Sequence, residues 1–244
     1  MFWAIVTGCV NDACPMVRRG LRRVMRATSR RVYDINTDAG RRAATRDFNW
    51  NDHQILRKRW TNLSEFAPGL WRSNQPSAAR LTQYKALGIR TIVSLRGDSA
   101  RSYNQFEREA CKALGLELHH IHISSARELP AGAQLLESIE QLSDLPRPLL
   151  LHCKSGADRT GFAAALVLIL VEGGSVQDAA RQMTRKHIHF PRSKSGVLGH
   201  VFRVYMRDAE PSGQGFRTWL EKGYDPDAIT ADFKDWRIGA GRWA

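Results

Sequence analysis

Two strongly apolar segments, a predicted strand and a predicted helix, follow each other closely in the second half of the sequence. The run from Pro148 to Leu151 is short and apolar, which is typical of a strand buried on both faces. The run from Phe162 to Leu170 is also apolar throughout and is long enough for a helix buried on all sides. The sequence therefore predicts a buried strand, a tight loop and a buried helix in succession.

Strand and helix patterns alternate along the preceding region. Gly88 and Gly115 follow two of the predicted helices, as expected for residues that end a helix in the left-handed conformation. The pattern predicts helices over residues 76–87, 103–114 and 130–142, and strands over residues 89–95 and 116–123. Such alternation produces parallel strands with right-handed connections. We therefore expect an α/β fold with a central, mostly parallel sheet flanked by helices.

The two ends of the chain are expected to add further parts to this domain. Helical patterns cover residues 48–60, 176–186, 197–206, 216–224 and 226–236. We expect the last two segments to dock on the domain through three large aromatic side chains, Trp219, Phe233 and Trp236. We therefore expect the 244 residues to form three parts: a basic N-terminal arm over 1–46, a domain over 47–210 and a helical extension over 211–244 that packs on the domain. For the arm, both an ordered and a disordered state are open.

The loop between the apolar strand and helix has the composition of an anion site. It reads His152-Cys153-Lys154-Ser155-Gly156-Ala157-Asp158-Arg159-Thr160-Gly161. Backbone N–H groups of such a loop and of the first helical turn lack partners within the helix, so they form a cradle for an anion. The positive end of the helix dipole also lowers the pKa of a nearby thiol. This combination predicts a thiolate that attacks phosphorus.

The side chains of this loop have distinct expected roles. Cys153 is the nucleophile, and Arg159 offers a planar fork for two equatorial oxygens of a phosphoryl group. Thr160 donates a hydrogen bond to the sulfur, which helps it leave when water attacks the phosphocysteine. His152 fixes the loop without reacting. The phosphate is expected to be bound by Lys154, Ser155, Gly156, Ala157, Asp158 and Arg159. A buried core cysteine beside a surface turn is the alternative, and five constrained positions in one strand-loop-helix context argue against it.

The motif formed by His152-Cys153, five residues and Arg159-Thr160 resembles the signature of the cysteine-dependent protein tyrosine phosphatase superfamily. Its particular residues are most similar to the compact dual-specificity-like group, especially its bacterial members. Residues 62–76 and 87–96 are similar to the opening strand and first βαβ unit of that group. The resemblance implies a phosphatase-like α/β fold of the dual-specificity type, a phosphocysteine intermediate, no metal and no cofactor.

The resemblance leaves the general acid open. The superfamily commonly uses an aspartate on a separate loop before the cysteine, whereas this chain has no aspartate between Cys111 and Asp144. Asp158 ranks first among the remaining carboxyl groups, since a loop aspartate is thought to serve in the lipid-directed myotubularin-like members. Glu128, after the third predicted strand, ranks second, and Asp98 ranks third. Asp158 also has a structural alternative, because a carboxylate in a first helical turn stabilises the helix without reacting.

Other polar residues fall at the same predicted edge of the sheet. Arg96 ends one strand. It points either to the cleft formed by residues 152–161, which we call the signature loop, or into a structural ion pair. His120 and His122 share a face of the next strand, but no cysteine or carboxylate cluster is near them. We therefore interpret these histidines as polar residues at a sheet end rather than as metal ligands.

Positive charge is concentrated near the N-terminus. The net charge is +13, and residues 1–60 contribute +8 of it through thirteen basic and five acidic residues. The segment from Val17 to Arg26 is basic and amphipathic, which suits an anionic membrane surface as well as a solvated arm. The chain has no recognisable nucleic-acid module and no interleaving of aromatic and basic residues. Nucleic acid is therefore not expected as a partner.

The four cysteines, at positions 9, 14, 111 and 153, do not suggest a disulfide framework. A free thiolate nucleophile fits a reducing, cytoplasmic setting. The basic N-terminal segment adds the expectation of a peripheral contact with a membrane. Cys111 lies in a predicted helix, where burial is the commoner role and redox protection of the nucleophile the alternative. No apolar run reaches the length of a membrane span. The oligomeric state is not encoded in any of these patterns.

These observations predict a phosphatase that hydrolyses phosphomonoesters of proteins, lipids or small molecules. The alternative is a weakly active or inactive phosphate-binding regulatory module, because the usual acid is missing; the presence of both Cys153 and Arg159 argues against it. A sulfurtransferase fits less well because its loop usually lacks this motif. An arsenate reductase fits less well because its loop lies near the N-terminus. Lys154 suits an anionic headgroup, whereas Asp158 reduces the positive charge of the loop. We therefore expect a shallow pocket that accepts several phosphoesters.

Overall fold

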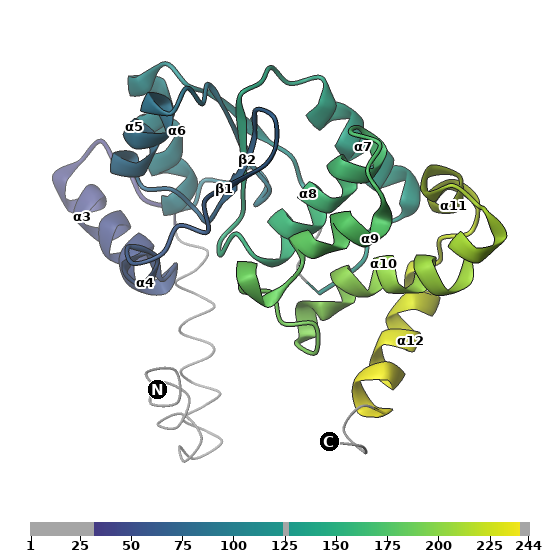
Figure 1. The fold of residues 1–244 in the computed structure, drawn as a ribbon. Helices are drawn as coiled ribbons and strands as arrows, with labels where there is room; N and C mark the ends of the chain where they lie inside the picture. The colour runs from purple at the N-terminus through teal and green to yellow at the C-terminus, as the bar shows by residue number, and fades with distance from the viewer. Residues whose placement is uncertain (1–31, 124–126, 240–244) are drawn as a thin grey trace, which may run out of the picture. The chain divides into compact units, whose positions relative to one another are not determined.

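A computed structural model describes residues 32–123 and 127–239 of the chain (Figure 1). The amphipathic segment predicted over residues 17–26, as well as Cys9 and Cys14, lies outside this part. The described residues form two compact units, the smaller of residues 32–56 and 99–106 and the larger of residues 57–98, 107–123 and 127–239. In this part of the chain, no helix combines the length and apolar composition that crossing a bilayer requires.

The smaller unit is helical and contains part of the segment predicted as a basic arm. Helix α3 (Asp38–Arg46) begins after Thr37, whose hydroxyl accepts a hydrogen bond from the N–H of Gly40. The helix continues into a π-helical turn (Asp47–Asn51), so the helix predicted over 48–60 is divided between this turn and α4 (Gln54–Arg57). Asp47 accepts a hydrogen bond of 2.6 Å from the hydroxyl of Ser102, and the rings of Phe48 and Phe106 pack together.

The larger unit contains a five-stranded sheet with the order β1-β2-β5-β3-β4. Its strands are β1 (Ser64–Ala67), β2 (Leu70–Ser73), β3 (Thr91–Ser94), β4 (Glu117–His120) and β5 (Leu149–His152). Strands β1 and β2 form an antiparallel pair, and every other pairing is parallel. The expected α/β fold with a mostly parallel sheet is confirmed.

Helices cover both faces of this sheet (Figure 1). Successive side chains of a strand point to opposite faces, so Leu150 packs with one cluster while Leu149 and Leu151 pack with the other. Helices α5 (Ala78–Ala86) and α6 (Ser102–Leu114) contribute to the smaller cluster. The larger cluster draws on α7 (Gly132–Ser143), α8 (Asp158–Leu170), α10 (Val197–Asp208), α11 (Phe216–Lys222) and α12 (Pro226–Gly239).

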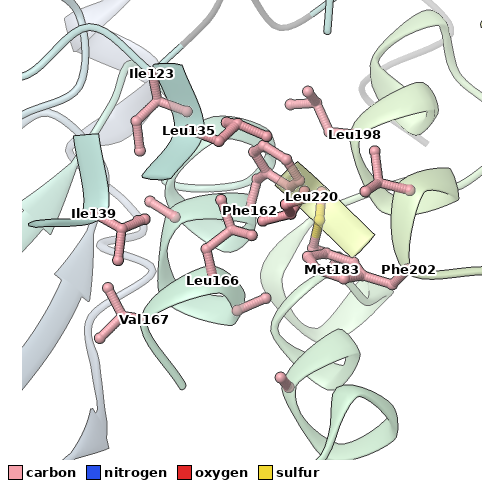
Figure 2. Packing of buried hydrophobic residues seen from close by; sticks show 14 of the residues in the cluster. Ile123, Leu135, Ile139, Phe162, Leu166, Val167, Met183, Leu198, Phe202 and Leu220 are labelled. Carbon is pink, nitrogen blue, oxygen red and sulfur yellow. The ribbon is translucent and has the colours of Figure 1, made fainter. Parts of the chain in front are cut away.

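Helix α8 lies at the centre of the larger cluster. Its residues from Phe162 to Val167 are all excluded from solvent. Figure 2 shows Phe162, Leu166 and Val167 surrounded by side chains from neighbouring elements, among them Phe202 of α10. A helix buried on every side requires apolar residues on every side, which explains why its sequence has no polar face. The buried strand and helix predicted around the signature loop are both confirmed.

The helix predicted over residues 176–186 is wrong in its length. Helix α9 (Val176–Ala179) is followed only by short 3-10 turns over Ala180–Gln182 and Arg185–His187. The carbonyl of Gln182 accepts a hydrogen bond of 2.8 Å from Arg72 of β2 instead of one from a helical N–H. The chain therefore leaves the helical path and turns back toward the signature loop.

The C-terminal helices dock through aromatic side chains, as the sequence predicts. Trp219 of α11 and Phe233 of α12 are both buried in the larger cluster, and Trp236 packs partly against it. Tyr205 of α10 makes edge contacts with Phe216 and with Trp219. Such pairs add to the stabilisation that their buried area provides.

Candidate active site

Three strands end in register at the edge of the sheet where the signature loop begins. Residue His152, the last of β5, pairs with Ser73 of β2 on one side and with Ser94 of β3 on the other. The chain segments that follow these strands therefore meet at one place, as parallel strands require. They are the signature loop after β5, Asn74 and Gln75 after β2, and Leu95 and Arg96 after β3.

The backbone of the loop is tightly packed against the end of β2. Gly156 has a φ of +70°, and a Cβ atom there would lie 2.5 Å from the carbonyl oxygen of Ser73. Glycine alone satisfies both the conformation and the space at this position. On the outer side, the carbonyl of Ser155 accepts a hydrogen bond from the side-chain amide of Asn62.

The thiol of Cys153 lies at the base of this loop and is almost completely buried. Burial alone would raise the pKa of this thiol. The guanidinium of Arg159, together with the backbone N–H groups of Thr160 and Gly156, outweighs the effect of burial, so the pKa lies below its ordinary value. The structure therefore brings the predicted nucleophile, arginine and hydroxyl together around one sulfur atom.

Arg159 is oriented from the first turn of α8 by the adjacent strand. One terminal nitrogen of its guanidinium donates a hydrogen bond of 3.0 Å to the carbonyl of Leu95, just beyond β3. This contact holds the planar group beside the sulfur of Cys153. A guanidinium fixed in this way can use its other N–H groups to bind a phosphoryl group bidentately.

Asp158 also lies in the first turn of α8, and one of its oxygens is held by a buried histidine. Nδ1 of His189 lies 2.7 Å from Oδ1 of Asp158, and the His189 ring is excluded from solvent. The side chain of Asp158 itself is 22% exposed. Asp158 is therefore positioned by a residue from a distant part of the chain, while remaining partly open to a ligand.

The segment that carries His189 is attached to the signature loop at a second point. Asn62, which binds the carbonyl of Ser155, also donates a hydrogen bond of 2.9 Å to the carbonyl of His187. Between the two attachments, Ile188 adopts a left-handed backbone with a φ of 62°, which is strained for a β-branched residue. His187 and His189 point inward, whereas Ile188 and Phe190 are exposed beside the loop.

Behind the loop, a buried carboxylate links three of the converging segments. Glu107 of α6 accepts a hydrogen bond from the side-chain amide of Gln75, and it lies within ion-pair distance of His152. The carbonyl of the same Gln75 amide accepts a hydrogen bond of 2.9 Å from Arg96. The backbone N–H of Gln75 donates to the carbonyl of Lys154. His152 and Arg96 thus belong to a network that supports the loop from behind.

A second buried group, Arg72 of β2, lies directly beneath the loop. Its guanidinium donates a hydrogen bond of 2.7 Å to the carbonyl of Gly156 and a longer one to that of Ala157. The other terminal nitrogen donates to both the carbonyl and the side-chain oxygen of Gln182. Burial lowers the pKa of Arg72 to about 10, and the thiolate of Cys153 acts in the opposite direction.

The other two candidate acids lie in different surroundings. Asp98 forms an ion pair with Arg108 and is largely exposed. Glu128 is exposed on the turn that precedes α7. Cys111 is buried in the smaller hydrophobic cluster, where burial and the charge of Glu107 raise its pKa to about 12. A thiol with a raised pKa is almost entirely protonated at neutral pH and is therefore a weak nucleophile.

Several residues of the site were not predicted from the sequence, namely Asn62, Arg72, Gln75, Glu107 and His189. They come from four separate segments, and each acts through a contact with the signature loop or its immediate neighbours. Two features of the sequence could have indicated these residues. One is an arginine in the short buried strand β2, and the other is a glutamate on the inward face of α6. Each places a charge where the hydrophobic pattern predicts an apolar side chain.

The chain is similar in sequence to known phosphatases. A family model described as "DSP-PTPase phosphatase fused to NAD+ Kinase" matches residues 13–195. The dual specificity protein phosphatase TpbA of Pseudomonas aeruginosa (strain UCBPP-PA14) is 32% identical over 124 residues, which cover 51% of this chain and 54% of that protein. The inositol diphosphatase DSP2 of Oryza sativa subsp. japonica is 29% identical over 104 residues, which cover 41% and 50%. The chain thus spans about half the length of these curated relatives.

Solved structures with similar chains include two phosphatases. The crystal structure of P. aeruginosa TpbA matches with a TM-score of 0.47 and 23% identity, over 71% of this chain and 91% of that one. The core catalytic domain of the PP-IP phosphatase SIW14 from S. cerevisiae, in complex with citrate, matches with a TM-score of 0.47 and 19% identity, over 72% and 94%. The family model covers well over half of the chain, and on that match the chain belongs to the DSP-PTPase phosphatase family.

Proposed function

We propose that this chain hydrolyses phosphomonoesters through a phosphocysteine intermediate on Cys153. The observation that carries the proposal is the position of the Cys153 thiol, which is buried at the junction of a strand, a glycine-containing loop and a helix N-terminus, where Arg159 and backbone N–H groups lower its pKa. Burial by itself would keep this group protonated, so the surrounding donors must favour the thiolate strongly. Family membership supports the same reaction.

In the first step, the sulfur of Cys153 attacks the phosphorus of a monoester bound in the loop. The S–P bond forms while the bond between phosphorus and the ester oxygen breaks, and the leaving oxygen takes a proton from a general acid. Arg159 and the backbone N–H groups of the loop stabilise the charge on the equatorial oxygens. In the second step water attacks the phosphorus, the S–P bond breaks and inorganic phosphate is released. The hydrogen bond from Thr160 stabilises the departing thiolate.

Asp158 is our candidate for the general acid. His189 holds Oδ1, so the carboxyl group has a defined orientation, and its side chain remains partly exposed at the loop. The second oxygen, Oδ2, is then the one that faces the leaving group in the proposed reaction. Asp98 is engaged by Arg108, and Glu128 lies on an exposed turn, which makes both weaker candidates in this structure.

The substrate class follows from the surroundings of the loop. Ile188 and Phe190 are 41% and 51% exposed. The same segment carries four exposed basic residues, Arg185, Lys186, Arg192 and Lys194. We infer substrates in which the phosphate is attached to a larger group, as in phosphoproteins, phospholipids or inositol phosphates. A reducing, cytoplasmic setting and a peripheral contact of the basic N-terminal segment with anionic membranes extend this proposal.

Phosphate release by a small set of variants tests the proposed reaction. Wild type is compared with Cys153→Ser, Asp158→Asn and Glu128→Gln on p-nitrophenyl phosphate, phosphopeptides and phosphoinositides. We expect turnover by wild type and none by Cys153→Ser. The Asp158→Asn variant loses about 100-fold or more on esters with poor leaving groups, and much less on p-nitrophenyl phosphate. A wild-type protein that binds phosphate ligands but releases no phosphate is a phosphate-reading module instead.

A further inference from the structure

Arg72 presents a physical problem, because its charge is buried without a carboxylate partner. The side chain is completely excluded from solvent. In the part of the chain that the structure describes, its hydrogen bonds go to the oxygens of Gln182, Gly156 and Ala157, all of which are neutral. An isolated buried charge costs several kcal/mol by general estimates, so it needs an opposite charge nearby.

The thiolate of Cys153 is the candidate for this charge. The carbonyls that Arg72 binds belong to the loop that Cys153 opens, and the two groups attract each other electrostatically. The other titratable groups facing them are Arg159 of α8, which is a cation, and His187 of the 3-10 turn. Burial and the proximity of Arg72 lower the pKa of His187 to about 4, so this ring is neutral at pH 7. Asp158, which follows Ala157 in the loop, is paired with His189, so Cys153 is the anionic group that opposes the burial of Arg72.

The position of Arg72 follows from the register of the sheet. Residue 72 lies on the same sheet face as Leu70, beneath α8, and pairs with Leu151 two residues before Cys153. A Cβ atom on Gly161 of α8 would lie 3.4 Å from a terminal nitrogen of Arg72. The strand, the helix and the loop thus enclose the guanidinium and exclude it from solvent.

The hydrogen bonds of Arg72 also orient the peptide groups of the loop. In a trans peptide the C=O and the following N–H point in opposite directions. Drawing the carbonyls of Gly156 and Ala157 down toward Arg72 turns the N–H groups of Ala157 and Asp158 away from it. That direction is the one in which the phosphate is bound in the proposed reaction.

We propose that Arg72 is a positioning residue of the active site: its charge, beneath the loop, adds to that of Arg159 in favouring the thiolate of Cys153, and its hydrogen bonds set the inward direction of the phosphate-binding N–H groups. This inference rests on the proposed phosphatase reaction only for its second half. The effect on the thiol is independent of turnover. It is therefore measured separately from catalysis.

Two substitutions separate the charge of Arg72 from its hydrogen bonds. Arg72→Gln removes the charge and keeps an amide donor, whereas Arg72→Lys keeps the charge and loses the planar fork. The thiol pKa is obtained from the pH dependence of iodoacetamide alkylation, followed by mass spectrometry on the peptide that contains Cys153. We expect Arg72→Gln to raise this pKa by about one unit or more, a tenfold loss of thiolate well below the pKa. Arg72→Lys changes it by less than about half of that while still lowering turnover.

Arg80 of α5 provides a matched control. Among the described residues, its guanidinium also donates only to neutral oxygens, those of Trp60, Asn74, Arg57 and Lys58. Arg80→Gln should lower thermal stability without changing the thiol pKa of Cys153. Equal pKa shifts in Arg72→Gln and Arg72→Lys, or no shift in Arg72→Gln, would overturn the proposal.

A second measurement leaves Arg72 in place and does not depend on the folding of its variants. In protein labelled with ¹³C-arginine, the guanidinium carbon of Arg72 should shift with pH at the pKa of the Cys153 thiol, and this titration should vanish in Cys153→Ser. If the chemical shift of the guanidinium carbon does not change at the pKa of the thiol, the pairing is contradicted. If the pairing is confirmed but wild type releases no phosphate, the proposed reaction fails and the electrostatic role of Arg72 stands.

Discussion

One carboxylate oxygen of Glu107 is shared by two segments of the active site. It accepts a hydrogen bond of 2.6 Å from the side-chain amide of Gln75 and lies 2.9 Å from Nε2 of His152. All three side chains are buried. A single atom on α6 thus ties the end of β2 to the residue immediately before the nucleophile.

Removing this carboxylate should destabilise the protein and loosen the loop. Glu107→Ala leaves the buried donor of Gln75 and the ring of His152 without their partner, which we expect to cost about 2–4 kcal/mol of unfolding free energy. Urea unfolding measures the loss. Glu117→Ala, at a largely exposed glutamate on β4, is the control and should stay within about 0.5 kcal/mol of wild type. Equal losses in the two variants would show that the buried contact contributes nothing.

A methyl group at position 156 should abolish most activity. In Gly156→Ala the new Cβ meets the Ser73 carbonyl at 2.5 Å and the Asn74 nitrogen at 2.7 Å, so the loop must move. We expect kcat/KM to fall about 100-fold or more, because small displacements of catalytic groups have effects of this size. The control is Gly115→Ala, where φ is also positive but nothing lies within 4 Å of the Cβ. That variant should lose stability and retain kcat/KM.

Replacing His189 should change how the rate depends on the leaving group. If His189 positions Asp158 for proton donation, His189→Asn weakens turnover of alkyl phosphates more than turnover of p-nitrophenyl phosphate, in the same direction as Asp158→Asn. A series of esters with different leaving-group pKa values measures this slope. His200→Asn removes a similar pair, between His200 and Asp232, that includes no residue of the loop, and should leave the slope unchanged. An unchanged slope in His189→Asn argues for a purely structural Asp158.

The stability of the protein should fall as the pH is lowered from about 6.5 to about 4. The pKa of His187 in the folded protein is lowered to about 4 by burial and by the cations Arg72 and Lys186, whereas the unfolded chain has the ordinary value of 6.5. Between these values the unfolded state binds more protons, so acidification favours unfolding. Melting temperatures across this window should vary less steeply in His187→Gln than in wild type.

The exposed His122 serves as the reference for that comparison. His122→Gln should reproduce the wild-type pH dependence within error. A His187→Gln variant with the same slope as wild type would show that other groups govern stability in this pH range.

Some elements were predictable because their signal lies in adjacent residues. Strand β5 and helix α8 are apolar runs whose burial follows from their composition, and Gly88 and Gly115 mark real helix ends with positive φ. The predicted helix over residues 176–186 failed for the opposite reason. Its local pattern is compatible with a helix, but the carbonyl of Gln182 is bound by Arg72, which is 110 residues away in the sequence.

The sequence alone determined the α/β alternation and the signature loop with Cys153 and Arg159, because both depend on neighbouring residues and on fixed spacing. The tertiary structure decided which distant groups surround that loop. Arg72, Glu107 and His189 reach it through the pairing of β2 with β5, the packing of α6 on the sheet and the return of the chain after α9. The charges and hydrogen bonds around the thiol are set by these long-range contacts, which no local pattern of residues encodes.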